Sequence, residues 1–469
     1  MLTALPELDP GRLFAGIDFA SSPTVVVAVS GGGDSIALLS LLARHVSPAR
    51  LAAVTVDHAL RPGSAAEAES VGRFCRDLGL RHAVLRWEGP KPATGLSAAA
   101  RDARYRLLAQ AARDLGATML FAGHTQDDQA ETVAMRRARG EGRGLAGMAP
   151  ATLLDDRLWL MRPLLGVRRE ALRDYLRASG IGWADDPTNE DAAYERVRVR
   201  RRLTDPAAFA EALRVAEQAA RERVRLGEAA AGLIATAENP LPGLIRIDPD
   251  VFLAAESAAA VYALRLLLAT AGGSEHLPDE TRATALLGRF RDPALRASLS
   301  RTTIERRKGG IYLRREARGL PEPHLAQDGE IWDGRFRLGN VEGETIGPAG
   351  GLAGRRVDEA QGVPPALARA AAGGWPAPLR RGECLALLAE QTDMDLPPPA
   401  ESSERARAFD PVVPGMPPLP GRPVALPLAA PFARILPSFD LAPARALARL
   451  LGGELPPPSP YAGHSAPRP

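Results

Sequence analysis

A glycine-rich stretch near the N-terminus carries the first residues whose types and spacing could do chemistry. It follows a β-branched run and precedes an apolar run at helical spacing, and it consists of Ser30, Gly31, Gly32, Gly33, Asp34 and Ser35. Glycines let the backbone turn and point N–H groups at a phosphate, which a helix N-terminus also favours. Asp34 would repel phosphate, so we expect it to hold Mg²⁺ there. The loop matches neither Walker A, which needs a lysine, nor GxGxxG. An ordinary strand-to-helix turn would look similar.

A second group of candidate residues contains three acids, Asp127, Asp128 and Glu131, at the expected start of a helix. Acids are common at helix N-termini because they interact favourably with the helix dipole, and this explains the two aspartates without any further role. Glu131 follows Asp128 by three residues and shares its helix face. Neighbouring carboxylates repel, so they favour a cation. That cation is either Mg²⁺ or a substrate ammonium.

Arginine is concentrated in one short segment. Five of the seven positions from 196 to 202 are arginine, namely Arg196, Arg198, Arg200, Arg201 and Arg202. Arginine is abundant throughout a chain that has only two lysines, Lys91 and Lys308, so abundance alone does not indicate nucleic acid. Charge runs are usually solvated surfaces. This density nevertheless favours salt-dependent contact with nucleic-acid phosphates.

The elements that must position these residues alternate between strand and helix. We expect strands at Thr24–Val29, Leu51–Val56, Ala83–Leu85, Thr118–Ala122 and Leu158–Met161. We expect helices at Ser35–His45, Ala65–Leu78, Ser97–Leu115, Asp127–Arg139 and Arg168–Ser179. This alternation predicts an α/β fold, a doubly wound parallel sheet with helices on both faces. Ligands bind beyond the carboxyl ends of such strands, so Ser30–Ser35, Asp57–Arg61 and His124–Glu131 should converge.

The 469 residues exceed one ordinary domain, and we expect three regions. They are an α/β domain at 1–205, a smaller, mostly helical α+β domain at 206–340, and a Pro/Gly/Ala-rich region at 341–469. The second should contain helices at 207–235, Asp248–Ala271 and Asp279–Phe290, and strands at Thr302–Glu305, Gly310–Arg314 and Ile331–Leu338. The third is expected to hold a small subdomain and a loosely ordered tail.

Composition also suggests where the protein works. No apolar run is long enough to span a membrane, and the N-terminus lacks the pattern of a secretion signal. Cys75 and Cys384 form no metal or redox pair and suit a reducing compartment. We therefore expect a cytoplasmic protein with no membrane partner.

The glycine-rich loop is similar to the PP-loop of ATP pyrophosphatases, and further motifs narrow the resemblance. In chain order they are SGGGDS, VDHALR, AARDARY, GHTQDDQAET, RGEGRGLAGM, MRPLL and DDPTNED. Together they resemble the tRNA(Ile)-lysidine synthase family over residues 24–203, and more loosely to about 340. The resemblance implies a ligase that uses ATP and Mg²⁺ to join L-lysine to C2 of the wobble cytidine of the CAU-anticodon tRNA(Ile). An adenylated cytidine is the intermediate, AMP and pyrophosphate are released, and codon specificity changes from AUG to AUA.

The resemblance also implies that 1–205 is the catalytic domain, that 206–340 binds tRNA, and that single residues have defined roles. Ser30–Ser35 would hold the ATP phosphates, with Asp34 and Asp127 on Mg²⁺. The residues of the reaction itself would be Asp34, Arg104, His124 and Asp128. Substrate lysine would contact Asp128, Glu131 and Arg162. Besides the arginine cluster, tRNA would contact Arg139 and Arg143 in a glycine-rich segment that closes over the RNA.

Two features of the resemblance concern the remaining sequence. The family's acidic D-x-x-N turn is matched by Asp186-Pro187-Thr188-Asn189, but Val197 stands where an asparagine usually follows the first arginine. One local polar contact is therefore in question. The resemblance also allows a homodimer, which the sequence does not test.

Three other functions fit parts of the sequence. A tRNA 2-thiolase would need CxxC ligands or suitably placed catalytic cysteines, which this chain lacks. An amidotransferase-type synthetase would need a glutaminase domain with a nucleophilic cysteine. An RNA-binding module with an inactive ATP site is disfavoured because Asp34, Ser35, Asp128 and Glu131 are all present.

Overall fold

The computed structural model describes residues 8–60, 63–92, 94–140, 142–184, 195–350, 363–380, 383–384 and 423–461. These residues form two compact units, and the boundary between them falls within helix α8, Pro206–Ile234. The first unit contains the described residues up to Arg223, together with Ile435–Phe439 and residues 457–461. The second contains Val224–Arg434 and Asp440–Pro456, again for the described residues. None of the helices in the described ranges has the length and apolar character of a membrane span.

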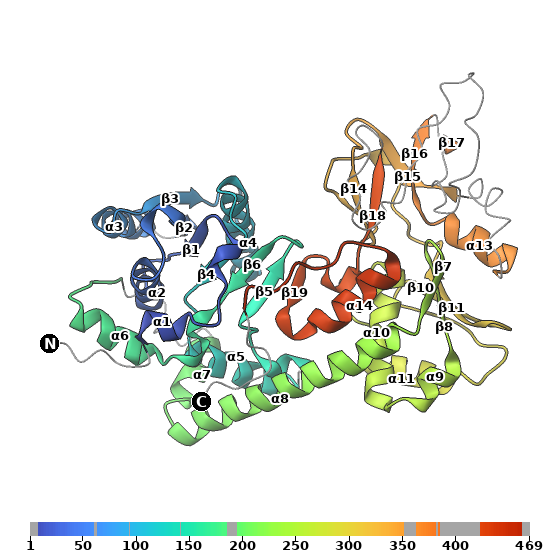
Figure 1. The fold of residues 1–469 in the computed structure, drawn as a ribbon, viewed down its shortest axis with the longest axis horizontal. Helices are drawn as coiled ribbons and strands as arrows, with labels where there is room; N and C mark the ends of the chain where they lie inside the picture. The colour runs from blue at the N-terminus through green and yellow to red at the C-terminus, as the bar shows by residue number, and fades with distance from the viewer. Residues whose placement is uncertain are drawn as a thin grey trace. The chain divides into compact units, whose positions relative to one another are not determined.

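The first unit is built on a seven-stranded sheet in the order β19-β5-β6-β4-β1-β2-β3 (Figure 1). The strands are β1 Val25–Ala28, β2 Leu51–Asp57, β3 Arg81–Arg86, β4 Met119–Ala122, β5 Ala151–Leu154, β6 Leu158–Met161 and β19 Ile435–Pro437. Strands β6, β4, β1, β2 and β3 are parallel, which confirms the predicted fold class. At one edge β5 and β19 are antiparallel, and neither was predicted.

The strand order explains why the polar clusters meet. From β1 the chain proceeds to β2 and β3 on one side, and then returns to β4 on the other. The connections that follow β1 and β4 therefore run toward opposite edges of the sheet, and this switch point is where open α/β sheets typically bind ligands. Ala28 and Ala122, the last residues of the two strands, are register partners. The loops that begin at Ser30 and Gly123 consequently start side by side.

Apolar strand residues and the connecting helices form the core of this unit. The helices are α1 Pro10–Leu13, α2 Gly33–Ala43, α3 Ser64–Asp77, α4 Leu96–Asp114, α5 Gln126–Ala138, α6 Arg169–Ala178, α7 Glu195–Arg202 and the first part of α8. Val26, Val54, Leu120 and Leu160 from four strands pack with Leu108 of α4, all at most 1% exposed. The β-branched and leucine runs thus hold the sheet rigid beneath the loops that follow it.

The second unit has three small sheets and several helices. Strands β7 Glu238–Leu241, β8 Leu244–Ile247, β9 Arg296–Leu299, β10 Thr302–Arg307 and β11 Gly310–Arg315 form one sheet. The shorter strands are β12 His324–Leu325, β13 Ile331–Trp332, β14 Phe336–Gly339, β15 Thr345–Pro348, β16 Pro376–Arg380, β17 Glu383–Cys384 and β18 Val424–Pro427. The helices are α9 Pro249–Ala254, α10 Ser257–Gly272, α11 Glu280–Gly288, α13 Pro365–Ala372 and α14 Leu441–Leu451.

Two predicted elements of this unit were wrong in their extent. The single helix expected at Asp248–Ala271 is two helices, because Ala255 has extended backbone angles and α10 starts afresh at Ser257. The single strand expected at Ile331–Leu338 is a hairpin, because Asp333 and Gly334 both have positive φ. An Asp-Gly pair between apolar residues favours such a turn. The D-x-x-N turn at 186–189 and most of the proline-rich tail lie outside the described residues.

Candidate active site

The glycine-rich loop from Ser30 to Ser35, the predicted phosphate loop, is held in shape by its own hydrogen bonds. Helix α2 begins at Gly33 with Gly32 as its N-cap, and no side chain caps it, so its first N–H groups are available to an anion. Ser35 Oγ accepts from the Ser30 backbone N–H at 3.2 Å and donates to the Gly32 carbonyl at 2.9 Å. Gly31 has φ +90°, a conformation that side chains disfavour. The sequence therefore shapes this loop through both its glycines and its serines.

Two neighbouring segments pack closely against the loop. A Cβ on Gly123, directly after β4, would lie 2.8 Å from the Asp34 carbonyl oxygen, so glycine lets this chain segment approach the first turn of α2. On the other side Ala184 donates its N–H to the Gly31 carbonyl at 3.0 Å. Trp183 lies where a Cβ on Gly33 would touch its ring at 3.4 Å. Trp183 thus lies against the phosphate loop, a contact that sequence reasoning missed.

The acids of helix α5 are held by the helix N-terminus itself. Thr125 is the N-cap and is fully buried; its hydroxyl accepts from the Asp128 N–H at 3.3 Å. Asp128 Oδ2 in turn accepts from the Thr125 backbone N–H at 2.9 Å and from its hydroxyl at 2.8 Å. This capping box fixes one oxygen of Asp128 and leaves Oδ1 facing the other acids.

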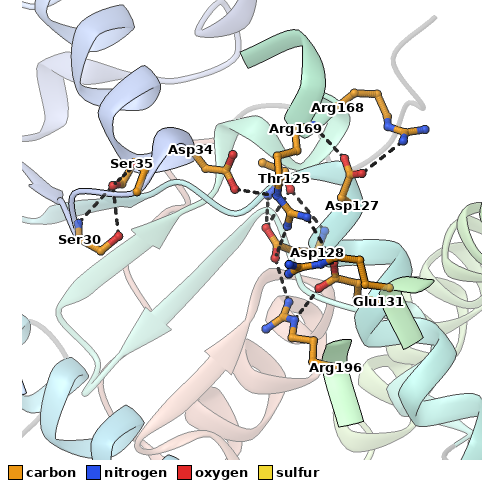
Figure 2. A network of polar contacts seen from close by, with 12 residues as sticks. Ser30, Asp34, Ser35, Thr125, Asp127, Asp128, Glu131, Arg168, Arg169 and Arg196 are labelled. Atoms are coloured by element: carbon orange, nitrogen blue, oxygen red, sulfur yellow. Dashed lines mark hydrogen bonds and ion pairs between the residues drawn. The ribbon is translucent and has the colours of Figure 1, made fainter. Parts of the chain in front are cut away.

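A single arginine, Arg169, joins the phosphate loop to this acid pair (Figure 2). Its Nε donates to Asp34 Oδ2 at 3.1 Å and its Nη2 to Asp128 Oδ1 at 3.1 Å. Its Nη1 lies 3.4 Å from Glu131 Oε1, and the Glu131 side chain is only 2% exposed. The predicted convergence of the first and third strand-end clusters is thereby confirmed, through a residue that sequence reasoning did not select.

Asp34 has the chemistry of a metal-holding carboxylate. Burial raises its pKa to about 6; Arg169 opposes this rise and the Asp128 charge adds to it. Burial and a neighbouring negative charge destabilise the ionised form of Asp34, and a divalent cation would stabilise that form more than one guanidinium does. Mg²⁺ typically takes one or two carboxylates and completes its shell with phosphate oxygens and water, so one acid beside a phosphate loop fits it. Within the described residues, three or more metal-binding side chains never gather into one cluster.

Asp127 has a different environment from Asp34. Its Oδ2 accepts the backbone N–H of Arg169 at 2.8 Å, and its Oδ1 lies 3.3 Å from Nη2 of Arg168. Both oxygens are thus engaged at the start of helix α6. The structure therefore places Asp127 as the acid that fastens α6 to α5.

The arginine cluster forms helix α7 and divides into two groups. Arg196 Nε lies 2.6 Å from Glu131 Oε2, and its Nη2 lies 2.9 Å from Asp128 Oδ1. Arg200, one turn later, donates to Glu131 Oε1 at 2.8 Å. Arg198, Arg201 and Arg202 are exposed. Val197, in the position where asparagine was expected, is buried at 7% exposure and packs as an apolar residue.

A separate cluster of positive charge surrounds Tyr105. Arg101 and Arg104 lie over its ring, at 4.9 and 5.3 Å from the centroid. In the described part of the chain, Tyr105 Oη, His124 Nδ1 and Arg162 Nε are buried without a hydrogen-bond partner. Burial, together with Arg162 and Arg104, lowers the pKa of His124 well below its usual range, so this histidine is neutral at pH 7.

Buried polar atoms without a partner, next to several cations, fit a polar, anionic group. Arg162 donates to the Ala149 carbonyl at 2.8 Å and to the Thr152 hydroxyl at 2.9 Å. The resemblance placed Arg162 with the acids, but the arginines that contact Asp128 and Glu131 in the described structure are Arg169, Arg196 and Arg200.

The described part of the glycine-rich segment, residues 142–148, is fastened to helix α5. Gln129 donates to the Met148 carbonyl at 3.1 Å and accepts the Met148 N–H at 2.7 Å. Arg136 donates to the carbonyls of Gly144 and Gly147 at 2.7 and 3.0 Å. Arg139 precedes the segment and pairs with Glu195 of α7 at 2.5 Å. The segment is therefore organised by the same helix that carries the acids.

Arg169 was missed for a definite reason, and one signal in the sequence could have found it. A pair of arginines at the start of an amphipathic helix looks like an ordinary solvated charge. A cation at a helix N-terminus opposes the helix dipole, however, so Arg168 and Arg169 need compensating acids. That conflict indicates an ion-pair role.

Comparison with known proteins gives a consistent result. Residues 12–207 match the model of a PP-loop domain family. The chain is 51% identical over 483 aligned residues to a tRNA(Ile)-lysidine synthase of Mesorhizobium japonicum, covering 99% of this chain and 100% of the relative. It is 43% identical over 360 residues to a tRNA(Ile)-lysidine synthase of Brucella melitensis, covering 73% of this chain and 80% of the relative.

The structural comparison is weaker. A U34-tRNA thiolase, NcsA, from Methanococcus maripaludis aligns with 45% of this chain and 77% of its own, at 16% identity and a TM-score of 0.39. The full-length sequence similarity, which extends through both units, is the decisive observation. The chain belongs to the tRNA(Ile)-lysidine synthase family.

Proposed function

We propose that the chain ligates L-lysine to C2 of the wobble cytidine in the CAU-anticodon tRNA(Ile), with ATP and Mg²⁺. The observation that carries this assignment is the ion-pair network in which one guanidinium spans Asp34 of the phosphate loop and the acids Asp128 and Glu131. A ligase of this kind needs its ATP site close to its site for a cationic amine. Here the side chain of Arg169 reaches from Asp34 to Asp128. The membership of the family supports the same reaction.

The first step of the proposed reaction adenylates the cytidine. The cytosine O2 attacks the α-phosphorus of ATP, the bond to the bridging oxygen breaks, and pyrophosphate leaves. The loop from Ser30 to Ser35 and the N-terminus of α2 would hold the phosphates. Asp34 would hold Mg²⁺, which neutralises charge on the departing pyrophosphate. Arg104 and the neutral His124 would donate hydrogen bonds to the reacting groups, and neither adds negative charge there.

The second step joins lysine to the base. Its ε-amine, after losing a proton, attacks C2, and the C2–O bond breaks as AMP leaves with its electron pair. The buried acids Asp128 and Glu131 would bind substrate lysine through an ammonium group, and Arg162 remains the proposed partner of the lysine carboxylate. Because both Asp127 oxygens are engaged by α6, we assign the metal to Asp34 alone.

The tRNA is proposed to lie along the exposed arginines. Arg198, Arg201 and Arg202 of helix α7, with Arg139 and Arg143 near the glycine-rich segment, would contact its phosphates. Arg196 and Arg200 would act indirectly, through the acids they bind. A persulfide-type thiolase reaction is disfavoured because Cys75 is fully buried and burial raises the pKa of its thiol to about 11.

An omission series tests this assignment. The full chain is incubated with ATP, Mg²⁺, lysine and the CAU-anticodon tRNA, each left out in turn, and pyrophosphate release is measured. We expect release to require tRNA, and AMP release to require tRNA and lysine. Pyrophosphate release that continues without tRNA would contradict the proposal.

A further inference from the structure

The guanidinium of Arg169 contacts carboxylates that the proposed function assigns to two different substrates. Asp34 belongs to the ATP side, and Asp128 and Glu131 belong to the lysine side. All three lie within 3.4 Å of one guanidinium nitrogen each (Figure 2). The Arg169 side chain is only 17% exposed, so water screens these contacts poorly. A single side chain thus contacts the acids of both sites at once.

The backbone of Arg169 is held in place by Asp127, while its side chain connects Asp34 with Asp128. It is the first residue of α6, and its N–H is bound by Asp127 at 2.8 Å. A cation in the first turn of a helix is unfavourable for that helix. An arginine at this position therefore does not stabilise α6. Its contacts with the three carboxylates explain why an arginine is present.

Charge balance shows what an incoming ammonium must do. Three carboxylates, from Asp34, Asp128 and Glu131, face three guanidiniums, from Arg169, Arg196 and Arg200. Adding another cation without displacing one would leave excess positive charge in a largely buried cluster, which is costly. Binding of a cationic substrate therefore requires an exchange.

The distances indicate which guanidinium exchanges. Glu131 lies 2.6 Å from Arg196 and 2.8 Å from Arg200, but 3.4 Å from Arg169. Oε1 of Glu131 is shared by Arg169 and Arg200, so Arg169 makes the weaker bond to it. Arg169 also has a second anchor in Asp34 that the other two arginines lack.

We propose that Arg169 is a positioning residue that competes with an ammonium group of lysine for Asp128 and Glu131. In the free chain it holds the acids together, and lysine binding releases its bonds to them. This inference rests on the proposed function. It predicts that removing the guanidinium makes lysine bind more tightly, whereas a purely structural arginine would give weaker binding when removed.

The experiment measures lysine affinity by calorimetry on the full chain and on three variants. Arg169→Gln should bind lysine roughly tenfold more tightly, the size of one competing charge-assisted bond. Arg169→Lys keeps the positive charge but loses the planar guanidinium that contacts three acids, so lysine should bind about threefold more tightly. Arg168→Gln is the matched control: this neighbouring arginine contacts Asp127 and the ring of Phe209, and its loss should leave lysine affinity unchanged.

Steady-state kinetics give a second readout. For Arg169→Gln we expect the KM for lysine to fall while kcat also falls, because Asp34 loses its partner; a structural defect would raise KM instead. Unchanged or weaker lysine binding by Arg169→Gln overturns the inference. Should that variant fail to fold, Arg169→Lys decides on the same criterion. Lysidine formation by the wild-type chain is measured in parallel. If it occurs and the affinity gain does not, the inference alone is wrong; if no lysidine forms, the proposed function is wrong.

Discussion

The Nε atom of Arg196 lies 2.6 Å from Oε2 of Glu131, and this ion pair joins a half-exposed helix residue to a buried acid. The arginine side chain is 42% exposed and the glutamate 2%. Helix α7 also carries the exposed arginines that we assign to tRNA. Arg196 and Arg200, one turn apart on the same helix, therefore connect the acids to the surface that we propose for tRNA.

Glu131→Gln tests the buried acid. The amide keeps the shape but removes one buried carboxylate, and Arg200 loses the acid it contacts while Arg169 and Arg196 keep Asp128. We therefore expect the KM for lysine to rise about 10- to 100-fold with a much smaller change for ATP. Glu211→Gln is the control, because Glu211 pairs with exposed Arg137 and Arg214 on the surface. Equal effects on lysine and ATP would contradict the assignment of Glu131 to lysine.

Asp34→Asn tests the phosphate loop. Loss of the carboxylate removes the proposed metal ligand, and we expect tRNA-dependent pyrophosphate release to fall about 10²- to 10³-fold. Asp174→Asn replaces an exposed acid that bonds Arg177, and it should retain wild-type rates. An Asp34→Asn enzyme that still adenylates tRNA would remove the loop from the proposed reaction.

Thr125→Ala and Asp128→Asn separate capping from substrate binding. Both changes weaken the capping box of α5 and should lower the free energy of unfolding by about 1 kcal/mol. Only Asp128→Asn removes a carboxylate, so only it should abolish lysine-dependent AMP release while leaving ATP binding intact. Chemical denaturation and AMP release, measured on the same preparations, provide the comparison. Normal lysine transfer by Asp128→Asn would refute its assignment.

Gln129→Ala tests the role of the glycine-rich segment. Two hydrogen bonds to Met148 are lost, which should raise the KM for tRNA several-fold and leave the values for ATP and lysine unchanged. Gln110→Ala removes similar bonds, to exposed Arg113 and Asp114 on α4, and should have no effect. A tRNA KM equal to that of the wild type would show that the segment does not position RNA.

His124 gives a prediction about pH. Burial lowers its pKa in the folded chain, so below the unfolded value of about 6.5 the unfolded state binds a proton that the folded state does not. The contribution of His124 to folding stability should therefore fall as pH drops from about 7 toward 5. His124→Asn should flatten this slope by up to about 1.4 kcal/mol per pH unit. The thermal midpoint of each protein is measured between about pH 5 and about pH 7. Equal dependence of the midpoint on pH in the two proteins would contradict the prediction.

Sequence reasoning identified the elements that rest on local patterns. The predicted strand at Leu158–Met161 has the same first and last residues as β6, and the predicted strand at Thr24–Val29 contains β1. Long apolar runs determine such elements because they are buried on both faces of the sheet. The edge strand β19 was missed because its three residues pair with β5 from more than 280 positions away, and nothing local marks them.

The candidate site shows the same division. Ser30, Asp34, Asp128 and Glu131 stand in short motifs that have a chemical reason of their own. Arg169 does not, because its role depends on three acids from two other elements. Arg196 and Arg200 were selected as charges for RNA, but the helical spacing that turns them toward the acids became evident only in the structure.

Mass spectrometry of the wobble nucleoside tests the central claim most directly. The CAU-anticodon tRNA is incubated with the full chain, ATP, Mg²⁺ and lysine, and then digested to nucleosides. The account predicts that cytidine at the wobble position gains the mass of lysine less one water, and that omitting ATP or lysine prevents this. An unmodified wobble cytidine in the complete reaction, from a chain that is folded and binds ATP, would contradict it.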